Sequence, residues 1–342
     1  MKIALATDNH FCEKSSIVQK IGTKYTVRIE NQLKSIEWFE NLAIDKGCSA
    51  VVYLGDFFDK SSLTDKEITA TKDIKWNNLK HYFIIGNHES GDSGLLFSST
   101  KTLESENHIM ISDPKKTDLG NCDLCFLPYI TESNRCALEE YFGVKTIKPR
   151  VILSHNDIAG IQMGPVVSRT GFNIEEIENN CDIFINGHLH NGQVITNKVI
   201  NLGNLTGKDF GEDASRYKHN IAILDTDTLS VELIENPYAF NFYKLEINSI
   251  DDIHKLNELK NQAVISIKCK NTLLNDVKTA IEANTDKIVE SRIITIRELS
   301  TESQEIDITD LTVDHLARFV ECCLNNIENS TILEEELAEI CK

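Results

Sequence analysis

Five short polar segments of this chain could bind metal ions, and each of them lies just after a run of apolar residues. Their Asp, Asn and His side chains offer carboxylate oxygen, amide oxygen and imidazole nitrogen, which are ligands for divalent cations. The segments are Asp8-Asn9-His10, Gly55-Asp56 with Asp59, Gly86-Asn87-His88, Ser154-His155 and Gly187-His188-Leu189-His190. Because no cysteine is among these ligands, the pattern favours a two-metal hydrolytic site over a structural zinc site.

The apolar runs that must position these side chains read as buried strands. They cover residues 2–6, 50–54, 82–85, 151–153 and 183–185. Ligands of open α/β sheets bind outside the carboxyl ends of the strands, so we expect one sheet edge to collect all five segments. Strands alternate with helical patterns up to about residue 235, which predicts a layered α/β domain. The strand-rich stretch from 181 to 235 predicts a second sheet packed on the first.

Each motif has an ordinary explanation when it is taken alone. A Gly-Asp pair such as Gly55-Asp56 is common in turns, and a single histidine such as His155 is more often structural. His188 and His190 are more specific, because residues at i and i+2 of an extended segment point to the same side. The occurrence of all five motifs in order makes a purely structural reading improbable, and Asp56 is the natural bridging carboxylate.

Composition sets limits on the partners of the chain. The formal net charge is −18, and residues 298–342 contribute −10 of it, so the chain as a whole does not attract nucleic acid. Bound metal ions, local basic patches or a partner would have to supply positive potential. We find no apolar stretch of about 18 residues and no signal peptide, and therefore expect no membrane span. Ten cysteines in such a chain suggest reduced thiols in a cytoplasm, the lone Cys122–Cys125 pair included.

The organisation changes after residue 236. Residues 242–247, 263–268 and 288–296 read as strands, with helices expected at 251–259 and 274–283, which together make a small α+β unit. A polar, acidic linker follows. The last segment shows one apolar helix face, formed by Val313, Leu316, Val320, Cys323 and Ile327, and then a capping-box signature at Thr331 and Glu334. This helical pair could pack on the parent domain or on a partner.

The order D-x-H, G-D-x-x-D, G-N-H-[DE], H and G-H-x-H, from Asp8 to His190, resembles the calcineurin-like metallophosphoesterase superfamily. Within it, the chain is most similar to SbcD-type DNA nucleases, the counterparts of the eukaryotic double-strand-break repair nuclease, and above all to the recombination endonuclease subunit of tailed phages. Gly55-Asp56-Phe57-Phe58-Asp59 and Phe126-Leu127-Pro128-Tyr129 carry this similarity, together with the small unit and the helical pair that follow.

The resemblance implies an α/β fold in which a two-sheet metallophosphoesterase sandwich is flanked by helices. A small α+β capping domain and a C-terminal helical hairpin would follow. The implied boundaries are a nuclease domain at 1–236, the capping domain at 237–298, the acidic linker at 299–309 and the helical pair at 310–342.

The resemblance also implies roles for the site residues. One metal would be bound by Asp8, His10, Asp56 and His190, and the second by Asp56, Asn87, His155 and His188. His88 would face the scissile phosphate and help to protonate the leaving 3′-oxygen, and a metal-bridging hydroxide would be the nucleophile. Asp59 would orient a histidine ligand. Glu89 stands where Asp is commoner, so it would approach His88 from further away. We expect two divalent ions, Mn²⁺ before Mg²⁺, Fe²⁺ or Zn²⁺.

The function implied is a DNA nuclease, both exo- and endonucleolytic, in the recombination, repair or replication of DNA in a bacterium or phage-infected cell. Its partner would be an SbcC-type coiled-coil ATPase of the SMC kind that binds the face from Val313 to Ile327, and relatives of this type commonly form homodimers. Two other readings stay open. The same site would serve a small-molecule phosphodiesterase or protein phosphatase, and the fold could act as a non-enzymatic scaffold.

Overall fold

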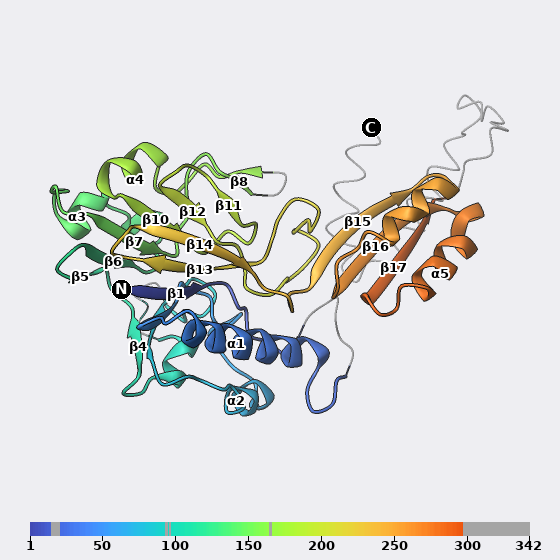
Figure 1. Ribbon diagram of the computed structural model, residues 1–342, viewed down its shortest axis with the longest axis horizontal. Coiled ribbons are helices and arrows are strands. Elements are labelled where there is room, and N and C mark those ends of the chain that lie inside the picture. Colours follow the sequence, from blue (N-terminus) through green and yellow to red (C-terminus); the bar gives the residue numbers. More distant parts are fainter. Residues whose placement is uncertain (15–20, 93–94, 96, 164–165, 297–342) are drawn as a thin grey trace, which may run out of the picture. The chain divides into compact units, whose positions relative to one another are not determined.

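The computed structural model describes residues 1–14, 21–92, 95, 97–163 and 166–296 (Figure 1). The predicted linker at 299–309 and the helical pair at 310–342, with Val313, Leu316, Val320, Cys323 and Ile327, lie outside these residues.

Two six-stranded sheets form the larger part of the described chain. The first has the order β14-β13-β1-β2-β3-β4, and the second has the order β11-β12-β10-β7-β6-β5. The first contains β1 (Lys2–Ala6), β2 (Ala50–Tyr53), β3 (Lys80–Ile84), β4 (His108–Ile111), β13 (Asn220–Asp225) and β14 (Ser230–Glu235). The second contains β5 (Lys115–Asp118), β6 (Asp123–Leu127), β7 (Arg150–Ser154), β10 (Ile183–Asn186), β11 (Gln193–Val194) and β12 (Val199–Asn201). A short hairpin pairs β8 (Gln162–Met163) with β9 (Val166–Val167).

The prediction that one sheet edge collects all five ligand segments is wrong. The strands β1, β2 and β3 pair in parallel in the first sheet, whereas β7 and β10 pair in parallel in the second. The two sheets pack face to face, as expected, through an apolar core. In that core Leu5 and Val52 of the first sheet contribute with Leu153 and Ile185 of the second. The ligand segments therefore meet where the carboxyl ends of strands from both sheets lie close together.

Helices cover the outer faces of both sheets, as Figure 1 shows. α1 (Val27–Asp45) and α2 (Asp65–Thr71) pack on the first sheet, and α3 (Leu138–Phe142) and α4 (Ile174–Asn180) pack on the second. The side chain of Thr26 caps α1, and Ile29, Ile36 and Phe39 on its buried face contribute to the outer core of the first sheet. Short 3₁₀ helices lie at Ser99–Leu103 and Glu132–Asn134.

A third, smaller sheet follows residue 240. Its strands β15 (Asn241–Ile247), β16 (Ala263–Lys270) and β17 (Ile288–Ile296) are parallel and confirm the strands expected there. α5 (Leu274–Glu282) packs on one face of this sheet, and helix and sheet together form a separate apolar core. This is the arrangement expected for a small α+β unit. The helix expected at 251–259 is a 3₁₀ helix, Ile250–Leu256, and another short 3₁₀ turn lies at Asn271–Leu273. None of the described helices is long and apolar enough to span a membrane.

Candidate metal centre

The segments after the strands continue the sheet pairing beyond the strand ends, and this brings their polar side chains together. After β1, the N–H of Asp8 donates to the carbonyl of Gly55 at 3.0 Å, and the N–H of His10 donates to Asp56 at 3.0 Å. In the second sheet, the N–H of Gly187 donates to Ser154 at 2.9 Å. The ligand positions are therefore fixed by backbone hydrogen bonds rather than by loose loops.

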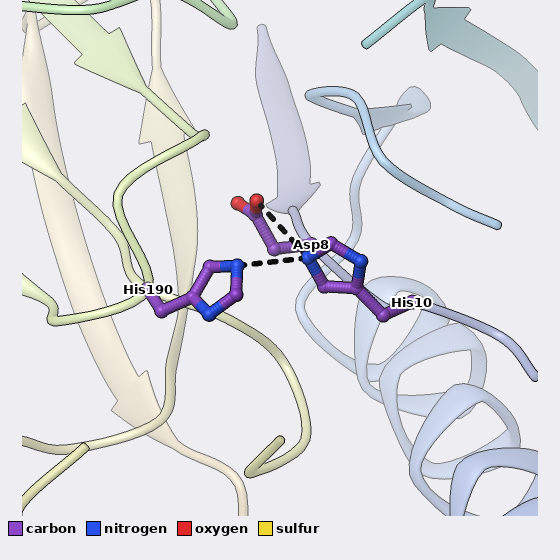
Figure 2. A group of neighbouring side chains, drawn as sticks. All are labelled: Asp8, His10 and His190. Atoms are coloured by element: carbon purple, nitrogen blue, oxygen red, sulfur yellow. Dashed lines mark hydrogen bonds and ion pairs between the residues drawn. The ribbon is translucent and has the colours of Figure 1, made fainter. Parts of the chain in front are cut away.

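One cluster combines Asp8, His10 and His190 (Figure 2). The Nε2 atoms of His10 and His190 face each other at 2.9 Å, and Oδ1 of Asp8 lies 3.8 Å from Nε2 of His10. That Oδ1 atom is buried and has no hydrogen-bond partner. Burial lowers the pKa of His10 to about 4, which keeps its imidazole neutral and able to act as a ligand. A lone carboxylate oxygen and two facing imidazole nitrogens fit a divalent cation between them.

The second cluster combines Asp56, His155 and His188, with Asn87 beside them. Oδ1 of Asn87 lies 3.3 Å from Nε2 of His155 and 3.0 Å from Nδ1 of His188. The other nitrogen of each ring faces an oxygen: Nδ1 of His155 donates to the carbonyl of Leu54 at 2.6 Å, and Nε2 of His188 lies 3.1 Å from Asp157. Each ring therefore points its second nitrogen toward the amide oxygen of Asn87, and these nitrogens, once unprotonated, could bind a cation together with that oxygen.

Asp56 belongs to the second cluster and also lies close to His10 of the first. Its Oδ2 atom is 3.2 Å from Nε2 of His155 and 4.0 Å from Nε2 of His10. Burial raises the pKa of Asp56, but His155 and His10 outweigh burial and hold the pKa far below its ordinary value. Burial likewise lowers the pKa of His155, yet the carboxylate of Asp56 outweighs it and raises that pKa to about 9. An ionised carboxylate in this place has the position that a bridging ligand requires.

Carboxylates outside the predicted ligand set orient three of the four ligand histidines. Oδ1 of Asp59 lies 3.0 Å from Nδ1 of His10, a position in which it can orient that ring, as the family resemblance implies. Asp157 orients His188, with Oδ1 of Asp157 at 3.1 Å from Nε2 of the ring. Oε1 of the buried Glu212 lies 3.6 Å from Nδ1 of His190. The last two carboxylates lie outside the motifs that the sequence shows. Asp157 follows His155 by two residues and could have been suspected, whereas Glu212 belongs to no motif.

His88 and Glu89 have different surroundings although they are neighbours in sequence. The side chain of His88 is 39% exposed, its ring centroid lies 4.8 Å from that of His10, and its Nδ1 is 3.1 Å from the carbonyl oxygen of Asp59. Glu89 is buried and accepts hydrogen bonds from the N–H groups of Gly86, at 2.9 Å, and Phe58, at 3.1 Å. Glu89 therefore links the two segments that carry Asp56 and Asn87, and the carbonyl of Asp59 orients the ring of His88.

Backbone strain concentrates at the centre. Asp8, His10, Asp56 and His188 adopt positive φ angles of 50°, 45°, 49° and 73°, a region that side-chain-bearing residues rarely occupy. Such conformations persist only where the surroundings impose them, and they cluster at functional sites.

Two glycines, Gly55 and Gly86, make the close approach of the segments possible. A Cβ atom at Gly86 would lie 2.2 Å from Oδ1 of Asp56, and one at Gly55 would lie 2.3 Å from Nδ1 of His155. Gly55 also has a φ of +101°, which L side chains rarely adopt.

Residues 1–192 match the family model described as calcineurin-like phosphoesterase. The chain belongs to this family. It is thus a metal-dependent phosphoester hydrolase, and the two clusters are its candidate sites for two divalent metals. No curated protein sequence matches the chain.

Several solved structures are similar to this chain. A novel archaeal phosphodiesterase shares 17% identity, covers 69% of this chain and 99% of its own, and has a TM-score of 0.36. A dimetal phosphatase from Danio rerio shares 13% identity, covers 69% and 99%, and has a TM-score of 0.40. The protein TT1561 of Thermus thermophilus shares 10% identity, covers 68% and 98%, and has a TM-score of 0.39.

Proposed function

We propose that this phosphoesterase is a two-metal-dependent DNA nuclease that works with an SbcC-type coiled-coil ATPase. The resemblance of the motifs to SbcD-type nucleases supports this specificity, and one structural observation carries it. The small sheet is attached to the segment that orients the metal centre. The N–H of Ala214 donates to the carbonyl of Phe242 in β15 at 3.0 Å, and the rings of Phe210 and Phe242 lie 5.3 Å apart. A capping domain that contacts DNA would be anchored at this place.

The chemistry of the site follows from its residues. Two divalent ions bound there would neutralise phosphate charge and lower the pKa of water at the reacting phosphorus. Asp8, His10, Asp56 and His190 would bind one ion, and Asp56, Asn87, His155 and His188 would bind the other. His88 is the exposed imidazole beside them. Its Nδ1 faces the carbonyl of Asp59, so its Nε2 could approach the phosphate and protonate the leaving 3′-oxygen.

The experiment compares the purified full chain with Asp56→Asn on linear duplex and single-stranded DNA in the presence of Mn²⁺. Loss of the bridging carboxylate should lower cleavage by more than about 100-fold, since changes to mere supporting groups already cost 10- to 100-fold. Asp276→Asn, on the exposed surface of α5, is the matched control and should cleave normally. Cleavage that survives Asp56→Asn would disprove the proposed centre.

The acidic charge of the chain is one observation in favour of a second candidate, a small-molecule phosphodiesterase or protein phosphatase. The same preparation should therefore be given bis-p-nitrophenyl phosphate and cyclic nucleotides. Turnover of these esters with no cleavage of DNA, and no competition by DNA, would replace the nuclease proposal with this one.

The ATPase partner is proposed from the sequence pattern between Val313 and Ile327. Leu316→Asp should abolish co-purification with such an ATPase and leave metal-dependent cleavage by the isolated chain unchanged. Binding that withstands this variant would remove the helical pair as the docking segment.

A further inference from the structure

A pocket of about 220 Å³ lies beside the metal centre, where the segment after β12 meets the small sheet. It is lined by Asn191, Phe210, Asp213, Arg216, Tyr217 and Lys244, together with Glu212. Asn191 directly follows the predicted ligand His190, and Glu212 orients that histidine. A molecule in this pocket would therefore lie next to whatever occupies the metal centre.

The pocket has the features of a site for a flat, polar ring. Phe210 and Tyr217 bring two aromatic side chains to it. Its volume is below the roughly 300 Å³ at which pockets for drug-sized ligands begin, so one ring system is the fitting size. Oδ1 of Asn191, whose residue is only 8% exposed, is buried without a hydrogen-bond partner. An amide in this condition can bond the edge of a ring that carries donors and acceptors, such as a nucleobase.

The acidic side chains of the pocket already form hydrogen bonds or ion pairs with other residues of the protein. Glu212 accepts from the side chain of Asn204 at 2.6 Å and from the N–H of Lys208. Asp213 accepts from Ser215 at 2.6 Å and pairs with Arg216 at 3.6 Å. These contacts reduce the repulsion that the two carboxylates would exert on a phosphate group.

Basic side chains continue from the pocket onto the sheet. Lys244, Ser266 and Arg292 are in register on neighbouring strands and so share the face opposite α5. Lys268 follows on the same face, two residues after Ser266, but it pairs with Glu246 of β15 at 3.6 Å, so Lys244 and Arg292 are the basic residues that carry the argument. Lys244 and Arg292 are exposed and form no ion pair among the residues that the structure describes. In a chain with a charge of −18, a basic row of this kind is a local attraction for phosphate.

We propose that the pocket binds one unpaired nucleobase of a DNA strand whose scissile phosphate lies at the metal centre. Phe210 and Tyr217 stack on the base, Asn191 bonds its edge, and Lys244 with Arg292 contacts the phosphates that follow. The inference rests on the proposed nuclease function and adds a substrate class to it. DNA with an unpaired strand is preferred, because a base held in a duplex cannot enter the pocket without unpairing.

The test measures binding by fluorescence anisotropy in EDTA, using the full chain, a labelled oligo-dT strand and a blunt duplex of equal length. Loss of one stacking contact in Tyr217→Ala should weaken binding of the single strand by about 5- to 150-fold and change duplex binding by less than about 2-fold. Tyr217→Phe keeps the ring and should bind like the unaltered protein. Equal weakening for both DNAs, or no weakening, would overturn the proposal.

Two further variants guard against misfolding. Lys244→Ala should lower the slope of log affinity against log salt by about 0.7 for the single strand, as expected when one phosphate contact is lost. Lys278→Ala removes an exposed charge from α5, on the other face of the sheet, and should leave the slope unchanged. If Tyr217→Ala loses the circular dichroism spectrum of the unaltered protein, the Lys244 comparison decides the question.

Activity assays in Mn²⁺, with the unaltered protein and with Tyr217→Ala, distinguish failure of the nuclease proposal from failure of the pocket proposal. Hydrolysis of bis-p-nitrophenyl phosphate without binding or cleavage of DNA would remove the nuclease function, and the base pocket with it. Cleavage of DNA by a Tyr217→Ala protein that keeps its single-strand preference would remove the pocket alone.

Discussion

Glu89 gives the sharpest test of how the metal centre is held together. Its carboxylate accepts one hydrogen bond from Gly86 and one from Phe58, and it is fully buried. Glu89→Gln keeps the size of the side chain but places an NH₂ group against one of these N–H donors. One buried donor then loses its acceptor, which costs about 1–3 kcal/mol. We expect the free energy of unfolding of the metal-free protein to fall by this amount.

The assay is urea unfolding in EDTA, because bound metal would add its own contribution to stability. Burial and the charge of Asp56 raise the pKa of Glu89 from its ordinary value of 4.5 to about 7, so ionised Glu89 is itself unfavourable in the folded protein. The comparison should therefore be made at about pH 4, where the group is protonated and Glu89→Gln changes the hydrogen bonds without removing a buried charge. Glu139→Gln, at an exposed position of α3, is the control and should change stability by less than about 0.5 kcal/mol. A similarly small change in Glu89→Gln would refute the linking role of this carboxylate.

Three other predictions concern separate parts of the molecule. Asp157→Ala removes the oxygen that orients His188, so calorimetric titration with Mn²⁺ should show affinity reduced by about 10- to 100-fold; unchanged affinity would contradict this role. Burial lowers the pKa of His108 below its ordinary value of 6.5, so the unfolded chain binds a proton more readily than the folded one. Stability should therefore fall as the pH drops below about 6.5, and His108→Gln should weaken that dependence in urea unfolding. Burial raises the pKa of the Cys125 thiol to about 12, whereas Cys136 is exposed. Brief alkylation of the native protein should modify Cys136 and leave Cys125 free, as peptide mass mapping would show.

Much of the fold could be predicted, because strand and helix patterns are local. The spacing of Ile29, Ile36 and Phe39 indicates an amphipathic helix from the sequence of α1 alone. The three strands of the small sheet can be predicted from local sequence in the same way. The assignment of strands to sheets is different. The run at 220–225 joins β1 in the first sheet, although the strands β10 and β12 that precede it belong to the second. Pairing of β13 with β1 joins residues more than two hundred positions apart, and no local pattern specifies such a pairing.

The sequence by itself determined the chemistry of the site: Asp, Asn and His after buried strands, with glycines where the segments must approach each other. These properties belong to single residues and to their immediate neighbours. Only the tertiary structure decided which side chains meet. It placed His190 of one sheet against His10 of the other, gave His188 and His190 their orienting carboxylates Asp157 and Glu212, and turned Glu89 toward backbone N–H groups. Contacts of this kind depend on the packing of two sheets on one core, since the side chains involved come from distant parts of the chain.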